Sequence, residues 1–569
     1  MCGIAGLVTT TVDPHRLSSM TDAIAHRGPD GRGIWISADG RIGLGHRRLS
    51  ILDLSDAGAQ PMERFHITLT FNGEIYNYLE LREQLTDYTF QSNSDTEVII
   101  AAYLRWGYDC LRRFNGMFAF ALWDKHKQEL FCARDRLGVK PFFYVQGKRE
   151  WLFGSEVKSL LASGVQAAPD MTVWGQYLVH GAFERAHQSF FEGVKSLPPG
   201  HYAVVKPDAT ISLRRWWYLP EQVLEPWSGS DKQAAEQLND LIDEAVKLRL
   251  RSDVPVAINL SGGLDSSSIT QSFLRQSQVE PHVFTCAFED PTYDEDKYAS
   301  SVVHGSNCIR HIVRLLPEQA QSSAQDAMRA QEAPFGGIGM LAYERIHRQM
   351  RKLGLKVALE GQGGDELFAG YAYYQSSLTA NLYQDGTSYL SPECINPDIR
   401  KGVAVLSYPT PFPSPIDNAL FRDLTETKLV RVLRMNDRKS MAQGVELRQP
   451  FLDYRVVEYA MRLPAHLKIR NGFGKYILRL AMNNKLHRNI VWSPKRPVVT
   501  PQREWMLTCL KPWVEEIIYS ESFSQRGMFD STAVQRTFSR YLIEKPNNTF
   551  PIWQWINTEL WFRTFIDKN

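Results

Sequence analysis

Cys2 is the residue whose type and position first suggest chemistry in this sequence of 569 residues. Removal of Met1 by methionine aminopeptidase, which accepts a small second side chain, would leave Cys2 with a free α-amino group. This group has a reference pKa of about 7.7 to 8.0, so much of it is neutral at cellular pH. A neutral amine beside a thiol is a built-in general base, and the thiolate can attack a carboxamide carbon. Cys2 is therefore a candidate nucleophile, although a residue after Met1 need have no function.

Three further segments could hold the substrate of such a nucleophile. Asn72 and Gly73 offer a side-chain amide and a backbone N–H as donors to an oxyanion, and Glu74 follows them directly. Asp95 supplies a carboxylate for a substrate ammonium, and Arg48 a guanidinium for a substrate carboxylate. Each segment alone could equally be a turn or a solvated surface charge, so it is their combination that indicates a site.

A second group of residues follows an apolar run at 254–260, which is typical of a buried parallel strand. Its small residues let backbone N–H groups approach a phosphate, and the N-terminus of a following helix would favour the anion. Asp265 could hold Mg²⁺, the usual bridge to phosphate oxygens. The segment is not a Walker A loop, because no Gly-Lys-Ser/Thr closes it. The residues predicted to form this phosphate site are Leu260, Ser261, Gly262, Gly263, Asp265, Ser266 and Ser267.

The elements around this loop predict a parallel sheet. Apolar runs at 254–260, 282–288 and 356–359 are predicted strands, and the helical patterns between them are typical of a doubly wound sheet. A second glycine-rich turn, 361–365, follows the third strand. Ligands of such sheets bind at the carboxyl ends of the strands, where both glycine-rich turns lie.

The two ends of the chain have a different character from this central part. Residues 1–205 contain many short strand-like runs broken by turn residues, with helical patterns at 78–85 and 96–106. We expect a layered α/β or α+β domain there. The stretch 206–232 is predicted to be a connector, and the C-terminal part of 233–569 is predicted to be mostly helical.

Composition predicts a soluble protein of at least two domains. Hydrophobic residues make up 43% and charged residues 22%, and the net charge of +2 gives no reason to expect a nucleic-acid or membrane partner. No apolar run approaches the ~18 to 20 residues that span a bilayer, and the start does not resemble a signal peptide. The seven scattered cysteines form no CxxC pair, which favours a reducing, cytoplasmic location.

With residues 25–30, the segments around Cys2 resemble the class II glutamine amidotransferase domain, which has the layered αββα N-terminal-nucleophile fold. The resemblance continues through 133–141 and 153–156 and covers nearly all of residues 2–200 in the family's order. It implies that Cys2 is the nucleophile and that its amine is the base in glutamine hydrolysis. It also implies that glutamine and its oxyanion are held by Arg48, Asn72, Gly73, Glu74 and Asp95.

Residues 261–267 resemble the pyrophosphate loop of ATP pyrophosphatases, which cleave ATP between its α- and β-phosphates. This resemblance implies that a carboxylate is converted to an acyl-adenylate. The second turn would then contribute Gly361, Gln362 and Gly363 to ATP binding and Asp365 as a Mg²⁺ ligand beside Asp265. Asp294 and Glu295 match a family stretch near the nucleotide, or they are exposed loop carboxylates.

Together the two halves resemble the glutamine-hydrolysing asparagine synthetase family from end to end. The family's fold is α/β, with a glutaminase domain expected at 1–205 and a doubly wound ATP-pyrophosphatase domain at 233–569. Lys495 matches a family lysine that would neutralise charge in the transition state. The implied cofactors are ATP and Mg²⁺, and the implied partners are glutamine and a small carboxylate. Homodimers are common in the family.

The second turn departs from the family's pattern. Gln362 stands where the family has a glutamate thought to deprotonate or position the incoming ammonia, and a glutamine cannot act as a base. Glu360 places a carboxylate two residues earlier. The hypotheses are amidation of aspartate to asparagine, the same chemistry on another carboxylate such as a uronic acid or a secondary-metabolite intermediate, and a cyclase resembling β-lactam synthetase. The intact glutaminase residues argue against the cyclase.

Overall fold

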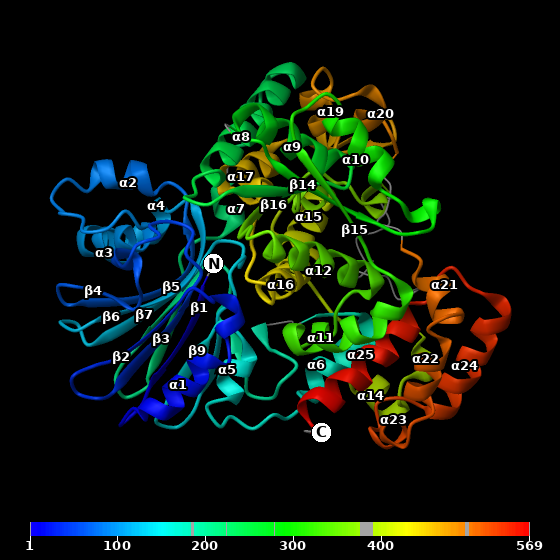
Figure 1. Cartoon of the computed structure of the whole chain (residues 1–569), viewed down its shortest axis with the longest axis horizontal. Coiled ribbons are helices and arrows are strands. Elements are labelled where there is room, and N and C mark those ends of the chain that lie inside the picture. The colour runs from blue at the N-terminus through cyan, green and yellow to red at the C-terminus, as the bar shows by residue number, and fades with distance from the viewer. Residues whose placement is uncertain are drawn as a thin grey trace.

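The computed structural model describes residues 2–183, 187–223, 225–277, 279–375, 391–494 and 500–567. Figure 1 shows an N-terminal part in blue and cyan, built of stacked sheets, on the left of a larger green-to-red part. The N-terminus lies where these two parts meet (Figure 1). The candidate nucleophile Cys2 is thus placed beside the second domain.

Two six-stranded antiparallel sheets form the N-terminal domain. The first has the order β10 (Lys195–Ser196), β8 (Phe143–Gln146), β9 (Trp151–Gly154), β1 (Gly3–Val8), β3 (Ile42–Arg48), β2 (Gly31–Ile36). The second has the order β12 (Ile211–Arg215), β11 (His201–Val205), β7 (Glu129–Arg134), β6 (Gly116–Asp124), β5 (Ile67–Ile75), β4 (Met62–Arg64).

The period of two along these strands explains the layers. On β1, Ile4 and Val8 enter the core between the sheets, whereas Leu7 joins the core formed with α1 (Pro14–Asp22). On β6, likewise, alternate residues enter the inter-sheet core, and Phe120 belongs to the core that contains residues of α3 (Asp95–Trp106). The result is the predicted helix–sheet–sheet–helix arrangement, which confirms the αββα fold class.

A five-stranded sheet organises the second domain, and all its strands are parallel. Its order is β15 (Ile309–Arg314), β14 (His282–Ala287), β13 (Val256–Asn259), β16 (Val357–Leu359), β17 (Glu446–Arg448). The chain winds outwards from β13 in one direction and then from β16 in the other. The two glycine-rich turns therefore leave adjacent strands at the point where the winding reverses, which is the preferred ligand position in such sheets.

Helices cover both faces of this sheet. Ile258 shares a core with residues of α8 (Asp231–Arg249) and α9 (Leu264–Gln276), while Ala257 shares a different core with residues of α12 (Gly337–Lys352). The other helices near the sheet include α10 (Asp296–Val303), α11 (Ala320–Gln331), α13 (Gly364–Leu367), α15 (Pro415–Thr425), α16 (Lys428–Met441) and α19 (Tyr476–Met482). The doubly wound architecture predicted from the sequence is confirmed.

The C-terminal end is helical, as predicted. It contains α21 (Gln502–Leu507), α22 (Lys511–Ile518), α23 (Glu521–Gln525), α24 (Ser531–Glu544) and α25 (Phe550–Phe565). These lie at the lower right of Figure 1. Every helix in the described part of the chain is too short or too polar to cross a membrane.

Two local expectations differ from the structure. Residues 211–215, inside the expected connector, form β12, because they pair with β11 and extend the second sheet by one edge strand. Residues 72–74, which could have been a turn, belong to strand β5, because its pairing with β6 continues through Asn72, Gly73 and Glu74. The candidate oxyanion residues are therefore part of a strand, not of a turn.

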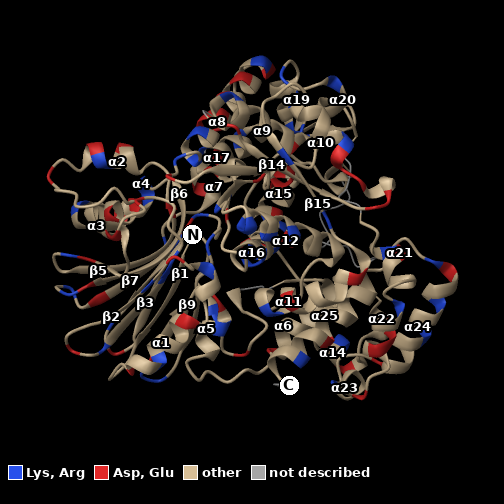
Figure 2. Ribbon diagram, viewed as in Figure 1, with Lys and Arg blue, Asp and Glu red and all other residues tan. Residues whose placement is uncertain are grey.

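Charges of both signs are interspersed over the two domains in the view of Figure 2, in keeping with the net charge of +2. The interface between the domains nevertheless contains buried ions. Arg27 donates to Asp437 of α16 at 2.8 and 3.1 Å and to Glu156 at 2.8 Å, and Arg438 pairs with Glu156 at 3.0 Å. Arg27 and Arg438 are 0% and 1% exposed, so this network joins the two domains through ion pairs that are shielded from bulk solvent.

Candidate active sites

Cys2 lies at the entry of β1, and its side chain is buried, with the residue 8% exposed. Its backbone N–H donates to Asn72 Oδ1 at 3.1 Å, and its carbonyl accepts from Arg27 Nε at 3.1 Å. Burial raises the pKa of the Cys2 thiol. The thiol is consequently protonated at neutral pH, and nucleophilic attack needs a base close to the sulfur.

The two candidate oxyanion donors follow each other on β5. Asn72 is 0% exposed, and its Nδ2 has no hydrogen-bond partner among the described residues. A buried amide N–H without an acceptor is costly, so this donor is set up for a ligand oxygen. At Gly73 a Cβ would lie 2.1 Å from the carbonyl oxygen of Met117 on the neighbouring strand. Only glycine allows β5 and β6 to approach this closely.

Cys2, Arg48, Gly73, Glu74 and Asp95 line a single pocket. Arg48 donates to the carbonyls of Ser55, at 2.8 Å, and Asp53, so its guanidinium is held by the loop on one side of the pocket. Residues that are far apart in the sequence and were predicted to bind glutamine are thus brought together.

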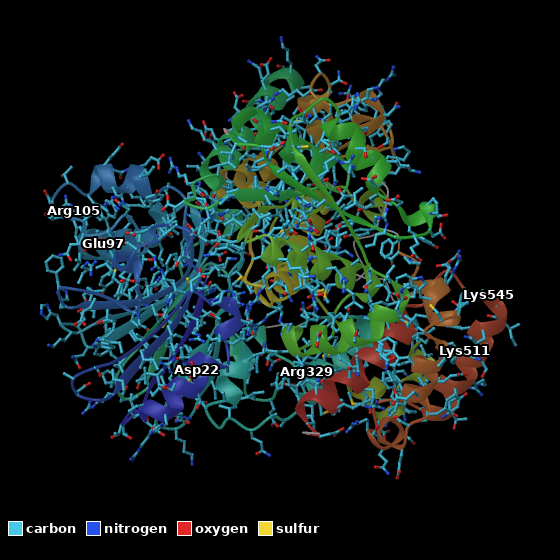
Figure 3. The ribbon with its side chains drawn as sticks, viewed as in Figure 1. Asp22, Glu97, Arg105, Arg329, Lys511 and Lys545 are labelled. Atoms are coloured by element: carbon cyan, nitrogen blue, oxygen red, sulfur yellow. The ribbon has the colours of Figure 1, made fainter. Side chains whose placement is uncertain are left out.

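Burial raises the pKa of both carboxylates in this pocket. Asp95 begins α3 and accepts from the N–H of Ile75 at 2.8 Å. Burial raises the pKa of Asp95 to about 7. Burial together with the charges of Glu446 and Asp95 raises the pKa of Glu74. Glu97, two residues after Asp95, is labelled in the N-terminal domain in Figure 3. Its carboxylate accepts hydrogen bonds from the N–H groups of Gln91 and Ser92.

Gln60 was not predicted from the sequence, although it lines the same pocket. Its side chain accepts from the N–H of Phe71 at 2.7 Å and donates to Thr96 Oγ1 at 3.1 Å, which ties β5 to the start of α3. An isolated glutamine before a proline carries no signal that could have identified it.

The first glycine-rich turn sits between β13 and α9, as predicted. Gly262 has φ +72°, and a Cβ there would lie 2.5 Å from the Cβ of Tyr298 on α10. The hydroxyls of Ser261 and Ser266 are 3.1 Å apart, and that of Ser267 is buried without a partner among the described residues. Leu260 differs from its neighbours, because its N–H and carbonyl are both bonded to residues of β14.

The second glycine-rich turn packs directly against the first. A Cβ at Gly361 would lie 2.8 Å from the backbone nitrogen of Ser266, and one at Gly364 would lie 2.8 Å from the carboxylate of Asp265. Gly363 has φ +97°, a conformation that favours glycine. Gln362 is partly exposed beside it. The two turns, which carry the predicted ATP-binding residues, are therefore in direct contact.

Lys475 connects the two candidate Mg²⁺ ligands. Its ammonium pairs with Asp265 and lies 2.7 Å from Asp365 Oδ1. Although burial opposes the charge, these carboxylates raise the pKa of Lys475. Asp265 and Asp365 are two carboxylates, and no cluster of three or more His, Cys, Asp or Glu that could hold a metal ion occurs among the described residues. Two carboxylates with substrate phosphates are a usual Mg²⁺ environment, so Asp265 and Asp365 fit that ion.

Glu360, just before the second turn, lies in a buried polar cluster. Its carboxylate accepts from Asn259 Nδ2 at 2.7 Å and from Asn436 Nδ2 at 3.0 Å. Burial raises the pKa of Glu360 and lowers that of Lys439, whose ammonium lies 4.7 Å from the ring centre of Tyr343. These groups adjoin the ATP loop, because Asn259 is two residues from Ser261.

Asp294 and Glu295 lie outside the two glycine-rich turns, at the start of α10. Asp294 accepts from the N–H of Asp296 at 2.8 Å, and both residues are partly exposed. The charge of Glu295 is the largest cause that raises the pKa of Tyr343, which places it near the Glu360 cluster. Lys495 lies outside the described residues.

Comparison with known proteins identifies both halves of the chain. Residues 1–217 match a family described as glutamine amidotransferase domain, and residues 237–563 match one described as asparagine synthase. Asparagine synthetase [glutamine-hydrolyzing] 1 of Bacillus subtilis is 29% identical, with 100% of this chain and 97% of that protein covered. Amidase chyE of Penicillium rubens is 30% identical, with 92% and 90% covered. A solved glutamine phosphoribosylpyrophosphate amidotransferase from B. subtilis has a TM-score of 0.31 and 16% identity over 55% of this chain and 81% of that one.

Proposed function

Because the chain belongs to the asparagine synthase family, we propose that it releases ammonia from glutamine at Cys2 and uses it to amidate a carboxylic acid that ATP has activated. Membership makes the chain a glutamine-dependent ligase. One observation carries the proposal: a buried pocket at Cys2 and two glycine-rich turns in contact occur in one chain, on two domains that share a buried interface.

In the first half-reaction, the Cys2 sulfur attacks the carboxamide carbon of glutamine. The Cys2 nitrogen, a free amine once Met1 is removed, takes the thiol proton and passes it to the departing ammonia. Asn72 Nδ2 and the Gly73 N–H stabilise the oxyanion, which is supported by the missing partner of Asn72. Water then hydrolyses the thioester to glutamate. Arg48 pairs with the carboxylate of glutamine, and Asp95 with its ammonium.

In the second half-reaction, the acceptor carboxylate attacks the α-phosphorus of ATP and displaces pyrophosphate. Backbone N–H groups of 261–267 and the start of α9 bind the phosphates, while Gly361 and Gly363 shape the adjoining turn. Mg²⁺ held by Asp265 and Asp365 would neutralise phosphate charge. Lys475, between these carboxylates, would supply a further cation. We assign the same kind of role to Lys495 from the family pattern alone.

Ammonia then displaces AMP from the acyl-adenylate. It must cross the interface without meeting bulk water, where it would be protonated and lost. The buried interface network of Arg27, Asp437 and Arg438 supports a dry passage.

The seven cysteines form no disulfide, which supports a cytoplasmic location.

Aspartate is the acceptor that we propose first, since relatives across the whole chain are named asparagine synthetases. A different carboxylate, such as a uronic acid or a secondary-metabolite intermediate, is the second candidate. Two observations favour it: Gln362 replaces a glutamate of the family pattern, and other relatives over most of the chain are named amidases. The Glu360 cluster with Lys439 would then contribute to acceptor recognition.

Pyrophosphate release with glutamine, ATP, Mg²⁺ and a panel of carboxylates tests this proposal. We expect Cys2→Ala to abolish turnover with glutamine and to retain turnover with added ammonium. Cys509→Ala, which removes an exposed cysteine, should leave both activities unchanged. Loss of both activities in Cys2→Ala would refute the two-site mechanism. Turnover with a sugar acid and none with aspartate would select the second acceptor.

A further inference from the structure

Arg448 occupies an unusual position in the interface between the domains. It ends β17, the edge strand of the parallel sheet, and is 0% exposed. Its Nη2 lies 3.5 Å from Glu74 Oε1, in the glutamine pocket of the other domain. The rest of its guanidinium is fixed within its own domain, because Nε donates to Glu446 at 2.6 Å and Nη1 donates to the carbonyls of Arg249 and Arg251. An arginine held in this way has one orientation.

The backbone of the same residue holds the synthetase site. Arg448 is in register with Leu359 of β16, and its carbonyl accepts from the N–H of Glu360 at 2.9 Å. Glu360 directly precedes the second glycine-rich turn, whose Gly361 packs on the Ser266 nitrogen. One residue therefore contacts Glu74 through its side chain and the start of the ATP-binding turn through its main chain.

The charges around Arg448 make its side chain necessary for the glutamine pocket. Glu74, Asp95 and Glu446 are all buried, and the charge of Glu446 raises the pKa of both Glu74 and Asp95. Among the described residues, the Arg448 guanidinium pairs with both carboxylates, at 3.5 Å from Glu74 and 2.6 Å from Glu446. Without it, Glu74 would lose the charged group that orients its carboxylate, and the ammonium of glutamine would meet a displaced or protonated partner.

We propose that Arg448 is a positioning residue that completes the glutamine site from the synthetase domain and links that site to the ATP-binding turn. Displacement of the turn when nucleotide and acceptor bind would be transmitted through the short β16–β17 pairing to Glu74. Hydrolysis of glutamine would thereby follow acyl-adenylate formation. This inference rests on the proposed function.

Arg448→Met in the full-length protein tests the inference, and glutamate release and pyrophosphate release are measured in the same reaction. We expect the KM for glutamine to rise about tenfold, the factor that ~1.4 kcal/mol represents. Ammonium-dependent pyrophosphate release should stay within about twofold of the wild type, because the substitution removes an interaction of the glutamine site only. The ratio of glutamate to pyrophosphate should rise, because hydrolysis no longer follows adenylation.

A matched control comes from the same interface. Arg251 also belongs to the synthetase domain and pairs with Glu80 of the glutaminase domain at 2.6 Å, but Glu80 does not line the glutamine pocket. Arg251→Met should leave the KM for glutamine and the product ratio unchanged. If Arg448→Met misfolds, the double variant Glu446→Gln/Arg448→Met, which leaves no unpaired carboxylate at 446, should fold and show the same rise in KM.

Two results would overturn the inference. One is an unchanged KM and product ratio in the Arg448 variants. The other is an equal loss of the glutamine- and ammonium-dependent activities, which is the signature of a purely structural role. The KM of the residual glutamate release without ATP reports on the glutamine site independently of the synthetase reaction. Failure of the proposed function, seen as no pyrophosphate with any carboxylate, is therefore distinguishable from failure of this inference.

Discussion

Asp95 shows how burial sets the chemistry of a single side chain. The carboxyl group of an exposed aspartate titrates far below neutrality, whereas burial raises the pKa of Asp95 to about 7. The N–H groups of Ile75 and Thr96 and the charge of Arg448 oppose the shift, and Glu446 adds to it. A carboxylate must be ionised to bind an ammonium group. The proposed binding of glutamine by Asp95 therefore depends on pH within the cellular range.

We expect the KM for glutamine to rise as the pH falls through about 7, because protonation removes the charge of Asp95. In Asp95→Asn the KM should be high at every pH, and this part of the pH dependence should vanish. Initial rates of glutamate release between pH 5.5 and 8.5, taken without ATP, provide the measurement. A pH-independent KM in the wild type would contradict the role of Asp95.

At the scale of elements, strand β5 shows why the oxyanion residues occur where they do. Its pairing with β6 runs through Asn72 and Gly73, and the close approach at Gly73 leaves 2.1 Å between a Cβ and the Met117 carbonyl. A side chain there would push the strands apart and move the Asn72 amide away from Cys2. The glycine therefore serves the geometry of the strand pair and, through it, that of the site.

Gly73→Ala should lower kcat for glutamine by about 10²-fold or more, the usual effect of losing one oxyanion donor. Activity with ammonium should persist, because the synthetase domain is untouched. Gly402→Ala is a suitable control, since nothing lies within 4 Å of a Cβ at that glycine. Equal losses with glutamine and with ammonium would show that the substitution acts on the whole fold instead.

At the scale of the molecule, the interface is in direct contact with the candidate nucleophile. Arg27 binds the carbonyl of Cys2 and, at its other end, Asp437 of α16. Although burial opposes ionisation, Arg27 and Lys140 lower the pKa of Asp437. Breaking a buried ion pair leaves an uncompensated charge, which costs more than the pair contributes.

Asp437→Asn is expected to lower the free energy of unfolding by about 3 kcal/mol, because the buried Lys140 ammonium then loses its paired carboxylate and Arg27 keeps only Glu156. Urea denaturation followed by tryptophan fluorescence measures the change. Lys356→Met removes the interdomain pair with Asp30, whose partners are 29% and 27% exposed, and should cost less than about 1 kcal/mol. Similar losses in the two variants would contradict the importance of the buried network.

The predictions from sequence were most accurate where the pattern is local. The elements at 78–85 and 356–359 were predicted almost to the residue, because apolar periodicity and turn residues define such elements. Strand β12 was missed because Ile211–Arg215 is an exposed edge strand whose residues carry little apolar signal. The roles of Gln60, Lys475 and Arg448 were missed because each depends on contacts with distant segments.

The sequence by itself determined which chemistry the chain carries. Cys2, the oxyanion pair on β5, the two glycine-rich turns and their order along the chain are properties of residue type and spacing, and both family matches follow from them. Only the tertiary structure decided which charged groups pair. Lys475 lies between Asp265 and Asp365, and Arg448 lies between Glu74 and Glu446. The physical reason is that burial and pairing are set by which strands and domains become neighbours, and the spacing of residues along the chain does not specify that.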